Sequence, residues 1–271
     1  MFLKKLVVFF LGGLFSVANI SAHEMWIEPV QYDVALGSTI LAHEKVGTNF
    51  KGNEYAYLSE SYIELLLSVN GKTRDVKSRI GDLPAIHEKA NEEGLTVLSA
   101  RTSTSTVVYK AWDEFEGFIK SKGLDWVLKE HRKRDLSESD VSEAYSRYPK
   151  SLVKVGHGKG KDVFLGMPIE WLAENNPYIN TDEPVKLRLL WHGKPFKNTH
   201  VTIFNRIEGK LITSELITDS EGKIEVPRAN GGEFLVNSVQ MIKPSKTIAD
   251  LTGAVWESLW ASMTYQIPSK N

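Results

Sequence analysis

Residues 185–204 read VKLRLLWHGKPFKNTHVTIF and contain two short runs in which apolar and polar side chains alternate. Alternation with a period of two is typical of a β-strand that buries one of its faces. We therefore expect strands at 185–191 and 199–204, with the turn residues His192, Gly193 and Pro195 between them. The spacing and the turn chemistry predict an antiparallel β architecture for this part of the chain.

The rest of the second half follows the same pattern. Further strands are expected at 223–226, 233–241 and 261–267, each preceded by polar or glycine-rich turn residues. Short strands at intervals of roughly ten residues are typical of a β-sandwich. The prediction is a mainly β protein with immunoglobulin-like β-sandwich domains, of which residues 164–271 form the C-terminal one.

Residues 23–163 are expected to form an N-terminal β domain. The run SYIELLLSV at 61–69 reads as a strand, and the Asn70-Gly71 pair that follows is a strong signal for a tight hairpin turn. Two more strands are expected at 95–100 and 105–111. Trp26, Trp256 and Trp260 are expected to fill the core or a domain interface.

The hydrophobic period changes in the middle of the chain, and a helical insertion is expected at about 112–148. Trp112, Phe115, Phe118 and Ile119 recur at helical spacing. A second short helix is expected at 124–131, where the sequence KEHRKRD places His131 on a solvated face. A third is expected at 137–145.

Residues 1–22 have the three parts of a cleaved secretory signal peptide. Lys4 and Lys5 precede a short apolar run, and the small residues Ser21 and Ala22 provide a cleavage site. The apolar run is shorter than the roughly 20 residues that span a bilayer. The mature protein is therefore expected to begin at His23, in the periplasm, without membrane insertion.

Charge and cysteine content exclude several classes of function. The formal net charge is −1, and the loss of Lys4 and Lys5 makes the mature chain slightly more acidic. Such a balance gives no electrostatic reason to expect nucleic acid as a partner. The chain contains no cysteine, which excludes disulfides, thiolate metal sites and thiol catalysis.

Six segments carry a resemblance to a known family: AHEMWIEP, EAYSRYPKSLVKVG, LGMPIEWLAENNPY, LLWHGKPFKNTHVTIFNR, TDSEGKIEV and WESLWASMTY. They resemble exported proteins of unknown function labelled NikM-like or CbiK-like, the periplasmic component of nickel and cobalt uptake. The resemblance implies a transport role, with a membrane transporter or an outer-membrane receptor as partner. Relatives carry a histidine before the methionine of the penultimate strand, where this chain has Gln240-Met241.

The candidate metal ligand is His23. Cleavage after Ala22 would give this residue a free α-amine beside its own imidazole, and the two nitrogens can chelate one divalent ion. A third nitrogen would complete a set that suits copper or nickel. His43 is the first candidate for that role and His87 the second, while the carboxylates of Glu24, Glu28 and Glu44 could bind the metal or orient an imidazole.

Three functions remain open at this point. The first is a periplasmic protein that binds nickel, cobalt or copper for uptake, with no enzymatic activity. The second is a β-sandwich module that binds a peptide, glycan or protein partner without metal, in which case His23 is a surface residue and His43 a satisfied core histidine. The third is a copper-dependent oxidative enzyme with an open coordination position at His23.

Overall fold

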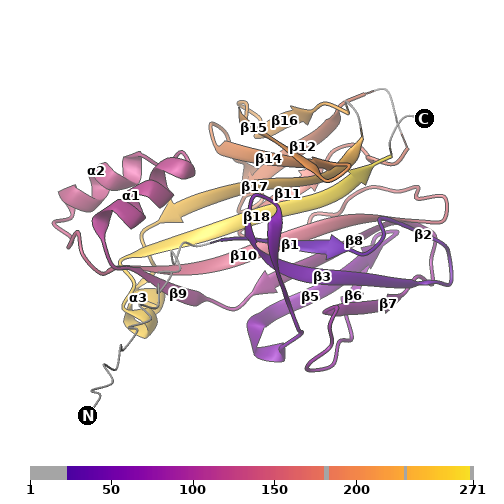
Figure 1. Ribbon diagram of the computed structural model, residues 1–271, viewed down its shortest axis with the longest axis horizontal. Coiled ribbons are helices and arrows are strands. Elements are labelled where there is room, and N and C mark those ends of the chain that lie inside the picture. The colour runs from indigo at the N-terminus through magenta and orange to yellow at the C-terminus, as the bar shows by residue number, and fades with distance from the viewer. Residues whose placement is uncertain (1–22, 180–182, 229–230, 269–271) are drawn as a thin grey trace, which may run out of the picture.

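The structure is a computed structural model that describes residues 23–179, 183–228 and 231–268 (Figure 1). The expected signal peptide, residues 1–22, lies outside the described residues. The described chain consists mainly of β-strands arranged in stacked sheets, so the expected mainly β sandwich architecture is confirmed.

A ten-stranded sheet runs through the middle of the molecule (Figure 1). Its main path has the order β15-β14-β17-β18-β10-β8-β5-β6, and β2 and β9 also pair with β10. Its strands are β2 (Asp33–Val34), β5 (Tyr62–Val69), β6 (Lys72–Asp75), β8 (Gly94–Thr102), β9 (Ser105–Tyr109), β10 (Val141–Val155), β14 (His200–Ile207), β15 (Lys210–Ile217), β17 (Gly232–Ile242) and β18 (Trp256–Ile267).

The hairpin expected at Asn70-Gly71 is confirmed. Both residues have positive φ angles, 50° and 75°, as a two-residue hairpin turn of type I′ requires. The turn joins β5 to β6 with Val69 opposite Lys72. This register sends alternate side chains of β5 into the core, where Leu65 and Leu67 are buried.

A small sheet covers one part of the central sheet. It contains β1 (Glu24–Pro29), β3 (Thr39–Thr48), β4 (Lys51–Tyr55) and β7 (Ile86–Lys89). The strands β1 and β3 are antiparallel, with Glu24 opposite Gly47 and Pro29 opposite Ala42. Ile27 and Ala42 pack with Leu98 and other apolar residues of the central sheet.

A second small sheet covers the other part of the central sheet. It contains β11 (Ile169–Ala173), β12 (Val185–Trp191), β13 (Lys194–Pro195) and β16 (Lys223–Val226). Trp171 and Leu187 belong to the apolar cluster that joins it to β17 and β18. The central sheet thus contains strands from both sides of the expected domain boundary near residue 163, because β10 and β18 pair in parallel.

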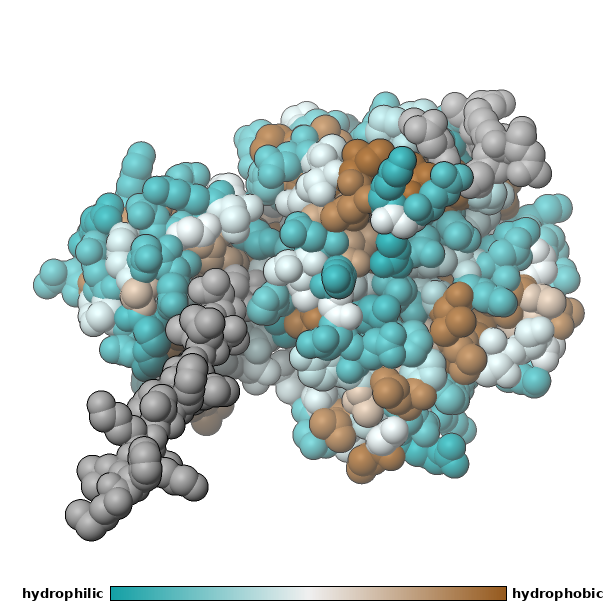
Figure 2. All heavy atoms as spheres, in the orientation of Figure 1, coloured by the Kyte–Doolittle hydropathy of each residue, from teal (hydrophilic) through white to brown (hydrophobic). Residues whose placement is uncertain are grey.

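The helical part is shorter than expected. The helices α1 (Trp112–Ser121) and α2 (Trp126–Lys133) pack over one end of the central sheet through a shared apolar cluster, and their outer surface is hydrophilic (Figure 2). The third helix expected at 137–145 is wrong, because the strand β10 begins at Val141. Two other short helices are η1 (Ser59–Ser61) and α3 (Lys246–Thr252).

The expected solvent exposure of His131 is also wrong. Its ring is fully buried, and its Nδ1 accepts a hydrogen bond of 3.0 Å from the Trp256 indole. Its Nε2 lies 3.0 Å from the Ser137 carbonyl. His131 is therefore a core residue of the helix-to-sheet interface, whereas Trp26, Trp256 and Trp260 are buried as expected.

Candidate functional site

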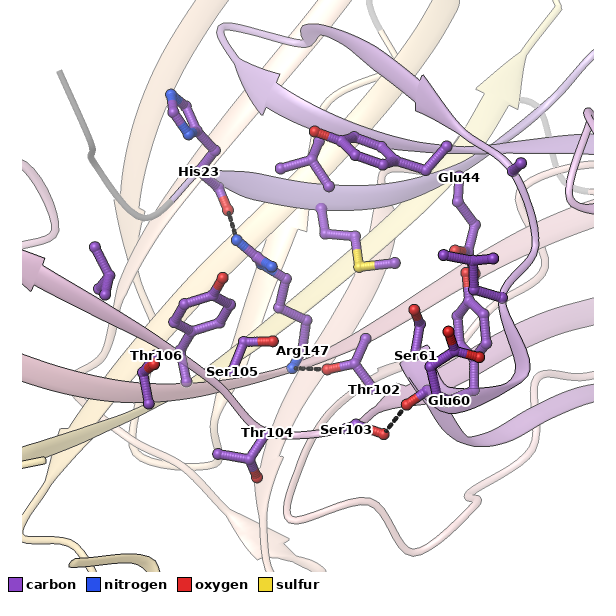
Figure 3. Close-up of a pocket in the computed structure, with 18 residues that line it drawn as sticks. His23, Glu44, Glu60, Ser61, Thr102, Ser103, Thr104, Ser105, Thr106 and Arg147 are labelled. Carbon is purple, nitrogen blue, oxygen red and sulfur yellow. Dashed lines mark hydrogen bonds between the residues drawn. The ribbon is translucent and has the colours of Figure 1, made fainter. Parts of the chain in front are cut away.

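A cavity of about 660 Å³ lies between the small sheet of β1, β3 and β4 and the strands β8, β9 and β10 of the central sheet (Figure 3). Its volume lies within the roughly 300–1,000 Å³ that is common for small-molecule pockets. Side chains of both sheets line it, among them His23, Glu44, Tyr55, Tyr62, Thr102 and Arg147.

One wall of the pocket is rich in hydroxyl groups. It is formed by the TSTST segment of residues 102–106, which connects β8 to β9. The Ser103 hydroxyl donates to the Glu60 carbonyl at 2.7 Å, and the Thr102 hydroxyl accepts from the Arg147 backbone N–H at 2.9 Å. Sequence reasoning missed this wall, because runs of serine and threonine are equally typical of ordinary turns.

Glu44 is the most unusual group in the pocket. Only 1% of its surface is exposed, and neither carboxyl oxygen has a hydrogen-bond partner among the described residues. Burial alone raises the pKa of Glu44 to about 8. An unpaired buried carboxyl group is costly, and groups with strongly shifted pKa values gather at functional sites. Glu44 therefore marks this pocket as the candidate site.

Arg147 contributes a positive charge to the same pocket. Its guanidinium lies 4.4 Å from the centre of the Tyr145 ring, and one terminal nitrogen donates to the His23 carbonyl at 3.0 Å. Its Nε is buried without a hydrogen-bond partner among the described residues. The guanidinium therefore orients the start of β1 and keeps one N–H group unsatisfied.

His23 lies at the edge of the pocket, immediately before β1. Figure 3 shows its ring turned away from the other labelled side chains, at the opposite end from Glu44. The ring also borders a shallower hollow formed with Gly47, Gly52 and Tyr55. His23 is therefore accessible while its main chain is held by Arg147.

The other expected metal ligands lie elsewhere. Glu24 lies opposite Gly47 of β3, which places His23 level with the residue that follows Gly47. His43 lies five residues from that level, or about 17 Å along the strand. The Nδ1 atom of His43 lies 3.2 Å from Glu54. His87 is an exposed residue of β7 that pairs with Leu41, next to His43 rather than His23.

Of the three expected carboxylate ligands, Glu44 lies in the pocket, whereas Glu24 and Glu28 are engaged in contacts outside it. Glu24 forms an ion pair with Lys122, at the C-terminal end of α1. Glu28 accepts hydrogen bonds from Trp26 and Lys45, both 2.8 Å long. Within the described part of the chain, no group of three or more histidine, aspartate or glutamate side chains could hold a metal ion together. Gln240 on β17 is not among the pocket-lining residues.

Comparison with known proteins gives a family but no function. The sequence model described as "Domain of unknown function (DUF4198)" matches residues 20–241. No curated protein matches the chain. Among the solved structures, the four N-terminal Ig domains of Dscam1 isoform 9.44, with zinc, match at 10% identity and a TM-score of 0.20. The match covers 90% of this chain and 52% of that chain, so it spans about half of that structure.

No helix among the described residues is both long and apolar enough to cross a bilayer.

Proposed function

The chain belongs to the DUF4198 family of domains of unknown function, and we propose that it is a periplasmic binding protein for a transition metal. It would carry nickel, cobalt or copper toward an uptake system, a membrane transporter or an outer-membrane receptor. The observation that carries this proposal is the position of His23, which lies at the pocket edge with its ring accessible and its carbonyl held by Arg147.

The chelate consists of two nitrogens from one residue. After cleavage at Ala22, the His23 α-amine and imidazole would bind the ion together, as nitrogen ligands suit copper and nickel. Because Arg147 holds the His23 carbonyl, the main chain that carries both nitrogens is partly oriented before the ion arrives. Orientation in advance lowers the entropy cost of binding.

The surroundings favour release as well as binding. His43, His87 and Glu24 are too distant or otherwise engaged to complete the coordination shell. The remaining positions are left to water or to a group supplied by a partner. The positive charge of the Arg147 guanidinium lies beside the chelate and repels the bound metal cation. An ion held in this way can be passed on, which suits a carrier rather than a store.

The test is a calorimetric titration of the mature protein with Ni²⁺, Co²⁺ and Cu²⁺, repeated with His23→Ala and His43→Ala. His23→Ala is expected to weaken binding by more than the roughly 10–100-fold that changes in outer-shell partners cost. His43→Ala is the matched control and should leave the affinity unchanged. Retention of the affinity in His23→Ala would show that His23 is not the ligand, and equal loss in both variants would contradict the account in which His43 takes no part.

A further inference from the structure

The pocket behind His23 contains two buried ionisable groups, an acid and a base, that do not satisfy each other. Glu44 has no partner for either carboxyl oxygen, and the Arg147 Nε has none, within the described residues. No hydrogen bond joins the Glu44 carboxyl group to Arg147 in that part of the chain, since neither Glu44 oxygen has a partner there. Buried polar groups are normally satisfied, so both point to a ligand that supplies the missing partners.

The two groups are separated along the strands that carry them. Glu44 lies opposite Ile27 of β1, whereas the Arg147 guanidinium reaches the His23 carbonyl, four residues before Ile27. Four residues of strand correspond to about 13 Å. A ligand that reaches both groups must therefore be extended and must carry a positive and a negative end.

The remaining lining of the pocket suits the rest of such a ligand. Ser61, Ser105 and Thr106 present hydroxyl groups, and Tyr55 and Tyr62 add aromatic rings. Hydroxyl groups can both donate to and accept from peptide groups. Aromatic rings pack against apolar side chains and interact favourably with an ammonium group.

We propose that this pocket binds a short peptide of about four residues with free ends, its ammonium group paired with Glu44 and its carboxylate with Arg147. A peptide of this length spans up to about 14 Å when extended, and the cavity of about 660 Å³ accommodates it. The proposal does not depend on metal binding at His23, since it uses other side chains of the pocket.

Binding would be coupled to a proton. Burial keeps Glu44 protonated at neutral pH in the free protein, and pairing with an ammonium group requires its ionised form. The other titratable or charged groups that line the pocket are His23, Glu60, Arg147 and the tyrosines. A peptide that binds as proposed should therefore release close to one proton from Glu44.

The test uses tetraalanine as the probe and isothermal titration calorimetry of the mature protein at neutral pH. Tetraalanine should bind at one site, and both N-acetylation and C-terminal amidation should weaken binding at least about tenfold. Titrations in buffers of different ionisation enthalpy should show about one proton released. The carboxylate end is tested on the ligand, because replacing Arg147 would also disturb the His23 carbonyl.

Glu44→Gln supplies the second arm. This variant should bind tetraalanine about as weakly as the native protein binds the acetylated peptide, and it should release no proton. Acetylation of the peptide should then cause no further loss of affinity, as expected for two groups that interact directly. Glu54→Gln is the control, since Glu54 lies opposite Lys45, on the other face of the sheet. Thermal melting establishes that each variant is folded.

Several results would overturn the proposal. Absence of tetraalanine binding would do so, and so would equal affinity for the blocked peptides. Binding of 1,4-diaminobutane as tight as that of tetraalanine would show that the site recognises only an ammonium group. Binding without proton release would show that Glu44 stays neutral and donates a hydrogen bond to a ligand acceptor.

Discussion

Replacing Glu44 with glutamine should change how the stability of the protein depends on pH. The pKa of Glu44 is about 8 in the folded protein, because burial disfavours the charged form, against a value of 4.5 for the exposed side chain. Between these values the unfolded chain has lost this proton while the folded chain retains it. The unfolded state therefore gains relative stability as pH rises, and the contribution of neutral Glu44 is full below about pH 4.5 and lost as pH rises toward 8.

The size of the effect follows from the linkage relation. One unit of pKa difference corresponds to about 1.36 kcal/mol. Between pH 5 and pH 7.5, the raised pKa of Glu44 should lower the free energy of unfolding of the native protein by about 3 kcal/mol. Glu44→Gln removes this term, so the variant should gain about 3 kcal/mol relative to the native protein over the same interval.

The assay is urea denaturation of both proteins at pH 5 and pH 7.5, followed by tryptophan fluorescence. The difference between the two proteins isolates Glu44, because burial also raises the pKa of Glu143, to about 7, in both of them. A difference that stays constant with pH would refute the reasoning, since it would mean that Glu44 ionises as easily in the folded chain as in the unfolded one.

Two further outcomes test the core. Lys150 is fully buried with Asp162 at 2.8 Å and Glu170 at 3.1 Å, so Lys150→Met should lower the free energy of unfolding by about 3–5 kcal/mol. Lys154→Met, whose partner Asp33 is 62% exposed, should cost less than about 1 kcal/mol in the same urea experiment. Burial lowers the pKa of His131, so the contribution of His131 to stability should fall as pH drops below about 6.5, and His131→Gln should gain stability relative to the native protein over that range.

Local pattern predicted most of the individual strands. The alternation in residues 185–191 matches β12, whose bounds are Val185–Trp191, because a strand with one buried face carries its signal in its own sequence. The start of β10 was missed because Ser142, Tyr145 and Arg147 place polar or amphipathic groups along a strand that is covered on both faces. The parallel pairing of β10 with β18 joins segments more than 100 residues apart, which no local pattern encodes.

The candidate site was predicted only in part. His23 could be singled out because the expected cleavage site precedes it directly, and the structure places it at the edge of the pocket. The pocket itself could not, because its walls come from two sheets and from segments as distant as Glu44 and Arg147. The helical spacing of Val127, Leu128 and His131 did carry a signal for burial of the histidine, but the charges beside it outweighed that signal.

The most direct measurement of the central claim compares two mature proteins, one beginning at His23 and one with a single glycine ahead of it. Each is titrated with Ni²⁺ and Cu²⁺ in the presence of a competing chelator. The protein that begins at His23 should bind one ion per chain tightly, and the extended protein should lose this site because its α-amine is displaced from the imidazole. Equal affinity of the two proteins would contradict an amino-terminal chelate and leave the pocket, rather than His23, as the functional centre.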